Sequence, residues 1–328
     1  MALPAYACID LTTAAVGADV RVRLYDVDPA TLSPDLDSVR AAIRRGVDAI
    51  VVAHFFGYPA DVPGVRALAT ECGIPVIEDA AQAVGGSLMG APLGSLGDAA
   101  ILSFGRGKGT TAGSGGAILV RTPELSEWTK ATASALVARS RGGSEVLKLS
   151  AQRVLSHPYL YAIPASLPGL RLGEMVYRTP REPAGMSAAS AAILCRTLEL
   201  ETGEVASRRA RATDLLSRLR EIKDVTPVRP IAGGESGFLR AAILDAAGSR
   251  GPRTDLGVLR GYPMTLDQHP QLQPLILPGE SAGKGARFLR DRLFTVPTHA
   301  HFTASDLASV TEWLATREVG SPVLVAAT

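Results

Sequence analysis

Three short apolar runs, separated by polar turns, constrain the fold of this chain most strongly. Val76–Ile77, Ala99–Leu102 and Gly116–Val120 are apolar without alternation, as strands covered on both faces are. Further upstream, residues 48–53 form another buried-strand pattern and residues 63–72 a helix pattern. This alternation of strands and helices predicts an α/β fold with a doubly wound, mostly parallel sheet.

Polar side chains gather at the carboxyl ends of these runs. Asp79 and Gln82 follow the first run, Ser103 follows the second, and Lys108 lies in the glycine-rich loop before the third. Open α/β sheets keep their ligand sites beyond the carboxyl ends of the strands, so we expect these four residues to converge on one crevice. A carboxylate, a hydroxyl and a lysine together suit pyridoxal 5'-phosphate (PLP), which needs an amine, a partner for its ring nitrogen and donors for its phosphate.

Lysine is scarce in this chain, which makes Lys108 informative. Arginine supplies nearly all of the 34 basic residues, yet arginine stays protonated and cannot form an imine. Taken singly, each of the four residues has a structural interpretation: a helix cap for Asp79, a surface position for Gln82, a strand-end hydrogen bond for Ser103 and a solvated loop charge for Lys108. Their joint order and spacing favour a shared site instead.

The same stretch resembles the DegT/DnrJ/EryC1/StrS aminotransferases, the sugar aminotransferase branch of the fold-type I PLP enzymes. The resemblance rests on the segments EDAAQAVGG, LGSLGDAAILSF and GKGTTAGSGGAILV. It continues upstream through VVAHFFGYPADVPGVRALATECGIPVIEDAAQ and LYDVDPATLSPDLDSVRAAI, and so covers about residues 2–121. It implies a PLP-binding large domain followed by a smaller C-terminal α+β domain.

The resemblance also implies roles for particular residues. Lys108 would form the Schiff base with the cofactor and shuttle the proton, and Asp79 would pair with the pyridinium nitrogen. Gln82 would contact the ring or its phenolic oxygen, and Ser103 would bind the phosphate. Tyr6 is the candidate for the aromatic side chain over the cofactor ring, with a core tyrosine as the alternative.

Two expected phosphate contacts are missing from the sequence. Relatives carry, upstream of the region matched here, a Ser-Gly-Thr turn at a helix N-terminus, a natural phosphate site, and no segment of this sequence resembles it. Relatives also carry an Asn-x-Arg motif where this chain has Arg181-Glu182-Pro183. The chain is therefore expected to be either an N-terminally truncated form or a member that has lost a phosphate site.

The chain divides into four expected parts. Residues 1–122 form the N-terminally incomplete large domain, and residues 123–185 a helical insertion that serves as a lid or a dimer contact. Residues 186–224 form a linking helix, and residues 225–328 the small C-terminal domain. His54, at the end of a strand, is expected to be a packed, hydrogen-bonded histidine.

Composition excludes several other classes of protein. A net charge of +2 without a block of basic residues gives no reason to expect nucleic acid as a partner. The three cysteines, Cys8, Cys72 and Cys195, are far apart, which predicts a reducing cytoplasm and neither disulfides nor a metal site. No apolar run is long enough to span a bilayer, so no membrane association is expected.

The sequence therefore favours PLP-dependent transamination of a keto-sugar, nucleotide-linked, with glutamate or glutamine as amino donor. A homodimer is expected, because fold-type I sites draw on both subunits. The alternative is a non-catalytic or regulatory homologue with weak or no PLP binding. A nucleotide-sugar binding module is a third interpretation, which the retained Lys108 disfavours.

Overall fold

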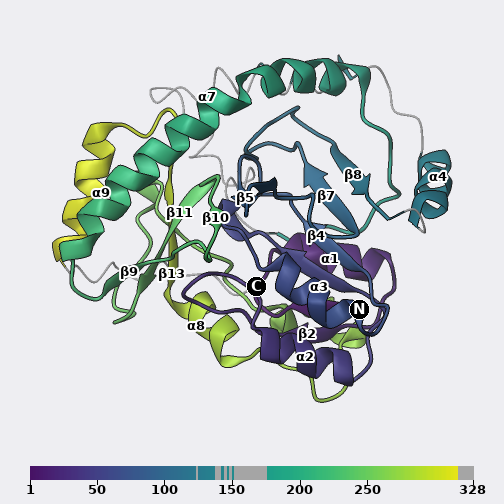
Figure 1. Ribbon diagram of the computed structural model, residues 1–328. Helices are drawn as coiled ribbons and strands as arrows, with labels where there is room; N and C mark the ends of the chain where they lie inside the picture. The colour runs from purple at the N-terminus through teal and green to yellow at the C-terminus, as the bar shows by residue number, and fades with distance from the viewer. Residues whose placement is uncertain (123–124, 137–141, 144–145, 148–149, 151–175, 317–328) are drawn as a thin grey trace.

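A six-stranded sheet organises the N-terminal half of the molecule. The computed structural model describes residues 1–122, 125–136, 142–143, 146–147, 150 and 176–316 (Figure 1). The strand order is β2-β1-β3-β4-β7-β8, all parallel except β8, which runs antiparallel to β7. The strands are β1 (Ala2–Pro4), β2 (Arg23–Tyr25), β3 (Ile50–Ala53), β4 (Val76–Asp79), β7 (Ala99–Ser103) and β8 (Gly116–Val120). The predicted doubly wound, mostly parallel sheet is confirmed.

Helices cover both faces of this sheet. They are α1 (Ile9–Gly17), α2 (Leu36–Arg44) and α3 (Val62–Thr70). Successive strand residues point to opposite faces, so Ile50 and Val52 pack with α2 and α3, whereas Leu3 and Val51 pack in the cluster that contains Ala15 of α1. Asp35 and Asp61 cap α2 and α3 by accepting backbone N–H groups.

The first strand and helix were not expected from the sequence. Cys8 occupies the N-cap position of α1 but makes no capping hydrogen bond through its side chain. Only Thr12 and Ala15 of this helix are buried, so the usual cap signal and apolar stripe are both weak.

A second, four-stranded antiparallel sheet lies in the C-terminal half, in the order β12-β13-β11-β9. Its strands are β9 (Val225–Pro227), β11 (Arg240–Asp245), β12 (Leu259–Arg260) and β13 (Leu293–Pro297). The helices of this half are α7 (Ala188–Arg218), α8 (Lys284–Arg292) and α9 (Ala304–Thr316), with α4 (Ser126–Ala135) preceding them. A small sheet joins the two halves: β5 (Ser87–Leu88), β6 (Ala91–Pro92) and β10 (Gly234–Glu235). Short 3₁₀ turns lie at Phe55–Gly57, Leu219–Glu221, Thr254–Leu256, Leu266–Gln268 and Gln273–Leu275.

The expected long helix is present as α7, a helix of 31 residues capped by Ser187. In Figure 1 it spans the molecule, from the end near β8 to the side of the C-terminal sheet. His299 and His301 lie in a turn after β13 rather than in a strand.

The largest core cluster joins both halves of the chain. It contains Leu3 and Val51 of the first sheet together with Tyr262, Leu266 and Leu289 from the C-terminal half. The four-part division of the chain thus stays a prediction. The predicted lid or dimer segment at residues 123–185 lies largely outside the described residues.

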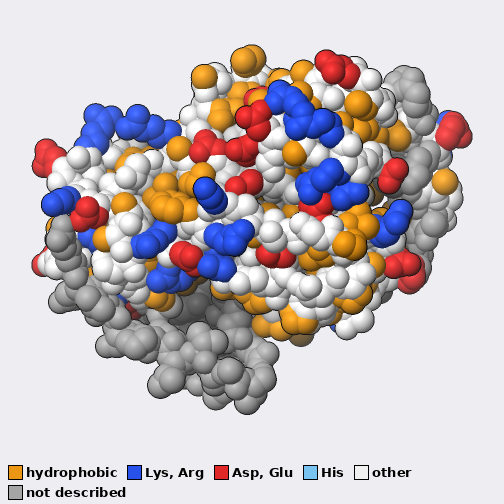
Figure 2. Space-filling view, turned by 90° about the horizontal axis from the view of Figure 1, so that it is seen from below, with side chains coloured by type: hydrophobic (Ala, Val, Ile, Leu, Met, Phe, Trp, Pro, Cys, Tyr) orange, Lys and Arg blue, Asp and Glu red, His pale blue; other side chains and the backbone are white. Residues whose placement is uncertain are grey.

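Charged side chains of both signs are interspersed over the face seen from below (Figure 2). Within the described residues, no helix combines the length and hydrophobicity that crossing a bilayer requires.

Candidate active site

A cavity of about 390 Å³ lies on the face of the sheet beside α1, where β4 and β7 end. Its walls are mainly apolar, with Leu3, Leu11 and Ile77 among the lining residues. The four polar residues singled out in the sequence line it together: Asp79, Gln82, Ser103 and Lys108. An apolar cavity with a few convergent polar groups at strand ends is the usual form of a small-molecule site in such folds.

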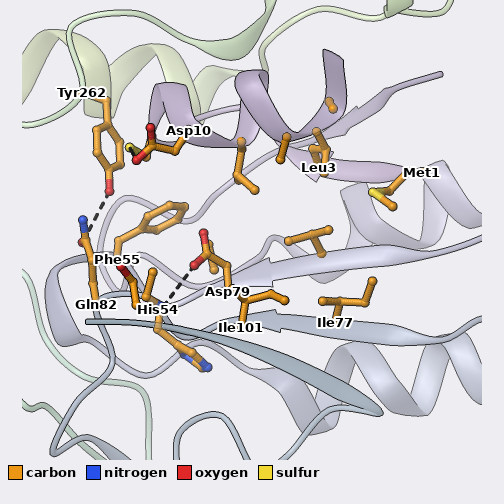
Figure 3. A pocket seen from close by; sticks show the side chains of 18 of the residues that line it. Met1, Leu3, Asp10, His54, Phe55, Ile77, Asp79, Gln82, Ile101 and Tyr262 are labelled. Atoms are coloured by element: carbon orange, nitrogen blue, oxygen red, sulfur yellow. Dashed lines mark hydrogen bonds between the residues drawn. The ribbon is translucent and has the colours of Figure 1, made fainter. Parts of the chain in front are cut away.

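Asp79 presents a carboxylate to this cavity from the last position of β4 (Figure 3). Its Oδ1 accepts a hydrogen bond from Ala81 N at 3.1 Å, which is its only hydrogen bond within the described part of the chain. Burial raises the pKa of Asp79, while the Ala81 N–H and the charge of Lys108 act in the opposite direction. The carboxylate is therefore short of positive partners, as a group that pairs with a bound cation would be.

Lys108 reaches the cavity from a tight loop. The loop closes through Phe104 N to Gly115 O at 2.9 Å and Ala112 N to Phe104 O at 2.8 Å. Lys108 N itself donates to Gly105 O at 3.3 Å. Backbone hydrogen bonds within the loop thus hold the main chain of the half-buried lysine in place.

Ser103 ends β7 at the start of this loop. Its Oγ accepts a long hydrogen bond of 3.5 Å from Gly105 N. The hydroxyl of Ser103 can therefore donate to a ligand.

Gln82 is oriented by two donors. Its Oε1 accepts hydrogen bonds from Phe56 N at 2.7 Å and from Tyr262 Oη at 3.4 Å. Because both contacts fix the oxygen, the Nε2 group is left to donate elsewhere. Phe56 carries an unusual positive φ of 56°, and its ring stacks on Tyr262 at 5.3 Å between centroids.

Tyr262 and Phe55 line the cavity with aromatic rings, and Tyr6 does not. The ring of Tyr6 is fully buried, and its Oη accepts a hydrogen bond from Tyr262 N at 2.7 Å. The structure therefore does not bring Tyr6 to the cavity but places it behind Tyr262, whose phenol has a pKa raised by burial. Of the neighbouring residues, Cys8 lines the cavity instead.

The position of Tyr262 had only a weak signal in the sequence. The sequence alone offers Arg240, Tyr262 and His269 as residues that could face a substrate, with a structural role as the alternative for each. Arg240 does play a structural part, since it donates to Thr295 Oγ1 at 2.7 Å and to Thr295 O at 2.9 Å. Neither Arg240 nor His269 lines the cavity.

A fully buried pair, His54 and Glu78, supports the end of β4 from behind. His54 Nδ1 accepts a hydrogen bond from Ala60 N at 3.0 Å, so the ring proton lies on Nε2, which donates to Glu78 Oε2 at 2.9 Å. Burial alone would raise the pKa of Glu78, but His54 and backbone N–H donors, including those of Gly94 and Gly97, lower it below its ordinary value. His54 is the packed, hydrogen-bonded histidine predicted from the sequence.

We searched the described residues for side chains that could bind a metal ion together. No group of three or more His, Cys, Asp or Glu side chains there is arranged to hold a metal ion.

The sheet topology and the lysine loop define a class of protein. A mostly parallel sheet with a carboxylate and a loop lysine at its carboxyl edge is the architecture of the fold-type I PLP-dependent transferases. The chain belongs to the DegT/DnrJ/EryC1/StrS aminotransferase family, whose sequence model matches residues 11–256.

Curated relatives match only part of this chain. An L-glutamine:2-deoxy-scyllo-inosose aminotransferase of Streptoalloteichus tenebrarius is 41% identical over 110 residues, 34% of this chain and 26% of the relative. A UDP-N-acetyl-3-dehydro-alpha-D-glucosamine 3-aminotransferase of Acidithiobacillus ferrooxidans is 41% identical over 101 residues, 30% and 27% of the two chains. A pleiotropic regulatory protein of Geobacillus stearothermophilus is 42% identical over 103 residues, 31% and 28% of the two chains. The matches thus span about a quarter of the length of these relatives.

Solved structures share the fold over nearly the whole chain. The aminotransferase TlmJ from Streptoalloteichus hindustanus superimposes with a TM-score of 0.72 at 24% identity, covering 96% of this chain and 78% of that one. An E. coli GDP-4-keto-6-deoxy-D-mannose-3-dehydratase with bound hydrated PLP gives a TM-score of 0.72 at 15% identity, covering 95% and 79%.

Proposed function

We propose that this chain is a PLP-dependent aminotransferase acting on a keto-sugar, nucleotide-linked, with glutamine or glutamate as amino donor. The observation that carries the proposal is the convergence of Asp79, Ser103 and Lys108 on one cavity at the carboxyl edge of the sheet. Relatives named as sugar or cyclitol aminotransferases support the substrate class, and those named L-glutamine aminotransferases support the donor. We further propose a homodimer, as in our expectation from the sequence.

The side chains around the cavity fit PLP. Among the residues that the structure describes, the Asp79 carboxylate has no cationic hydrogen-bond partner, which suits a pyridinium nitrogen. Ser103 and Gln82 have donors available for oxygen atoms, and Lys108 supplies an amine. When bound, PLP supplies an electron sink that stabilises negative charge at the reacting carbon of the substrate.

Each residue then has a chemical task. Lys108 would hold the cofactor through Nζ and would move a proton at the reacting carbon of the substrate. Asp79 would keep the ring nitrogen protonated. Gln82, oriented by Phe56 and Tyr262, would donate a hydrogen bond through Nε2 to the cofactor.

A second candidate function is that of a regulatory homologue that does not turn over substrate. The observation that favours it is the similarity to a relative named as a pleiotropic regulatory protein. The replacement of the Asn-x-Arg motif by Arg181-Glu182-Pro183 also agrees with it.

Absorption spectra with added PLP, before and after borohydride, distinguish the two functions. The aminotransferase predicts a near-visible band that borohydride abolishes, with the label recovered on the peptide that contains Lys108. A chain that binds no PLP, or binds it at another lysine, would contradict the proposed function and favour the regulatory homologue.

Replacing Asp79 by asparagine is expected to lower the activity and to raise the stability of the folded protein. Transamination should fall by about 100-fold or more, because an amide cannot hold the ring nitrogen charged. The folded protein should become more stable at pH 7. Burial raises the folded-state pKa of Asp79 above its unfolded-state value. The ionised carboxylate therefore lowers the stability of the wild type. This loss of stability develops as the pH rises from the unfolded-state pKa to the folded-state pKa.

Thermal unfolding of the wild type and of Asp79→Asn at several pH values checks this expectation. The gain of the variant should be largest at neutral pH and shrink toward acid pH, where the wild-type carboxyl is protonated in both states. A variant that is less stable than the wild type at pH 7 would contradict the assignment of Asp79 as an uncompensated charge.

A further inference from the structure

The loop that follows Lys108 is bound along one side of the long helix α7. Four polar side chains of the helix contact four loop residues in sequence, Gly109, Thr110, Thr111 and Ser114. The helix residues are Ser190, Thr197, Glu201 and Arg208. At intervals of 7, 4 and 7 residues, they fall on a single face of an α-helix.

The contacts are direct hydrogen bonds between helix and loop. Thr197 Oγ1 donates to Thr111 O at 3.0 Å, and Thr110 Oγ1 donates to Glu201 Oε2 at 3.3 Å. At the far end, Arg208 Nη1 donates to Gly109 O at 3.1 Å. Gly109 directly follows Lys108 in the chain, so Arg208 holds the carbonyl of the residue next to the lysine.

Arg208 is buried at a cost. Its side chain belongs to a residue that is only 6% exposed, and its Nε and Nη2 atoms are buried without a hydrogen-bond partner in the described part of the chain. Leaving such groups unpaired away from water is unfavourable. Within the described residues, the hydrogen bond from Nη1 to Gly109 O therefore links the buried guanidinium to the loop, while its Nε and Nη2 atoms stay unpaired.

Gly109 has no free space for a side chain where the loop contacts Arg208. A Cβ atom at this position would lie 2.8 Å from Val84 Cβ and 3.1 Å from Arg208 Nη1. Val84 and Arg208 therefore both pack closely against the backbone of Gly109. This close fit leaves no room for a side chain at the position next to Lys108.

We propose that Arg208 is a positioning residue for Lys108, which holds the Gly109 carbonyl so that the lysine amine is directed into the cavity. The proposal rests on the proposed function, because it gives Lys108 the cofactor-binding role. Arg208 itself does not line the cavity and acts only through the loop.

Arg208→Met tests the proposal, with Arg218→Met as the matched control. Arg218 lies on the same helix but is exposed and pairs only with Asp214, at 3.0 Å. Two measurements apply to the full chain: amide hydrogen exchange of residues 104–115, and the PLP concentration needed for half-maximal borohydride trapping on Lys108. In Arg208→Met, exchange in this loop should rise relative to the rest of the sheet, and the half-maximal PLP concentration should rise about tenfold. Arg218→Met should change neither.

Arg208→Lys and Thr197→Val guard against a variant that fails to fold. Arg208→Lys keeps the charge with a shorter reach and should restore part of the trapping. Thr197→Val removes the bond to Thr111 O at nearly constant volume and should raise loop exchange in the same direction. If Arg208→Met does not fold, the hydrogen exchange of the loop in Thr197→Val decides whether the contacts with α7 hold the loop.

The outcomes separate the two proposals. Trapping of PLP on Lys108 by Arg208→Met at the wild-type concentration would overturn the positioning role and leave the proposed function intact. A wild-type chain that traps no PLP on Lys108 overturns the proposed function, and hydrogen exchange then decides alone whether Arg208 holds the loop.

Discussion

Lys108→Arg is expected to abolish covalent capture of PLP and to reduce transamination by at least about 10³-fold. Arginine keeps the positive charge and much of the volume, but its guanidinium stays protonated and forms no imine. The loop should still fold, because its hydrogen bonds involve backbone atoms of Phe104, Gly105 and Ala112 rather than the lysine side chain. The near-visible band of the wild type should be missing from the variant, and borohydride should leave its peptides unlabelled.

Lys223→Arg is the matched control for this substitution. Lys223 is exposed and distant from the cavity lining, so the variant should retain both the band and the activity. If Lys108→Arg kept measurable transamination with PLP trapped on another lysine, the assignment of Lys108 would be wrong.

Glu78→Gln is expected to lower the free energy of unfolding by about 3 kcal/mol. Each carboxylate oxygen accepts two hydrogen bonds: Oε1 from Leu96 N and Gly97 N, and Oε2 from His54 Nε2 and Gly94 N, at 2.5–2.9 Å. An amide has one oxygen, so in either orientation its NH₂ group faces two donors. The variant therefore leaves two buried donors unpaired even though its shape is unchanged.

Denaturant unfolding of Glu78→Gln and of Glu199→Gln measures this effect. Glu199 is exposed on α7 and pairs with Arg196, so its variant should stay within about 0.5 kcal/mol of the wild type. Equal stability of the two variants would show that the Glu78 hydrogen bonds contribute little.

The stability gap between wild type and Glu78→Gln should depend on pH in a defined direction. The folded-state pKa of Glu78 lies below its ordinary value of 4.5. A carboxylate with a depressed pKa contributes stability that is complete above the unfolded-state value and is lost as the pH falls through the folded-state value. The gap should therefore be full at neutral pH and narrow below about pH 4.5.

The sequence was sufficient to predict the parts of the fold that local pattern controls. The apolar runs predict the strands β4, β7 and β8 at the right places, and Asp35 and Asp61 provide the expected helix caps. The expected cover on both faces was wrong for the edge of the sheet, where Ile101, Ile118 and Leu119 are about 40% exposed. Because parallel strands share one carboxyl edge, the meeting of Asp79, Ser103 and Lys108 followed from the same patterns. The helix α1 was missed since Cys8 provides no capping hydrogen bond.

Long-range packing explains what the sequence did not show. Tyr262 hydrogen-bonds to Gln82 from 180 positions away, and no local pattern links the two. Tyr262 lines the cavity, whereas Tyr6, the aromatic residue expected there, lies in the core. Arg208 was missed for a related reason, since an arginine in a long polar helix is normally solvated.

Phe56 contacts two residues of the cavity wall, Gln82 and Tyr262, and position 56 has little freedom for mutation. Its φ of 56° and ψ of 17° lie in a region that suits glycine or asparagine and is costly for an aromatic residue. Its ring nevertheless stacks on Tyr262, and its N–H donates to Gln82. Residues that relieve the backbone lose the stack, and other aromatic residues keep the strain, so position 56 has no conservative replacement. We therefore expect a substitution at position 56 to require a compensating change at Gln82 or Tyr262, the two residues that its backbone and ring contact.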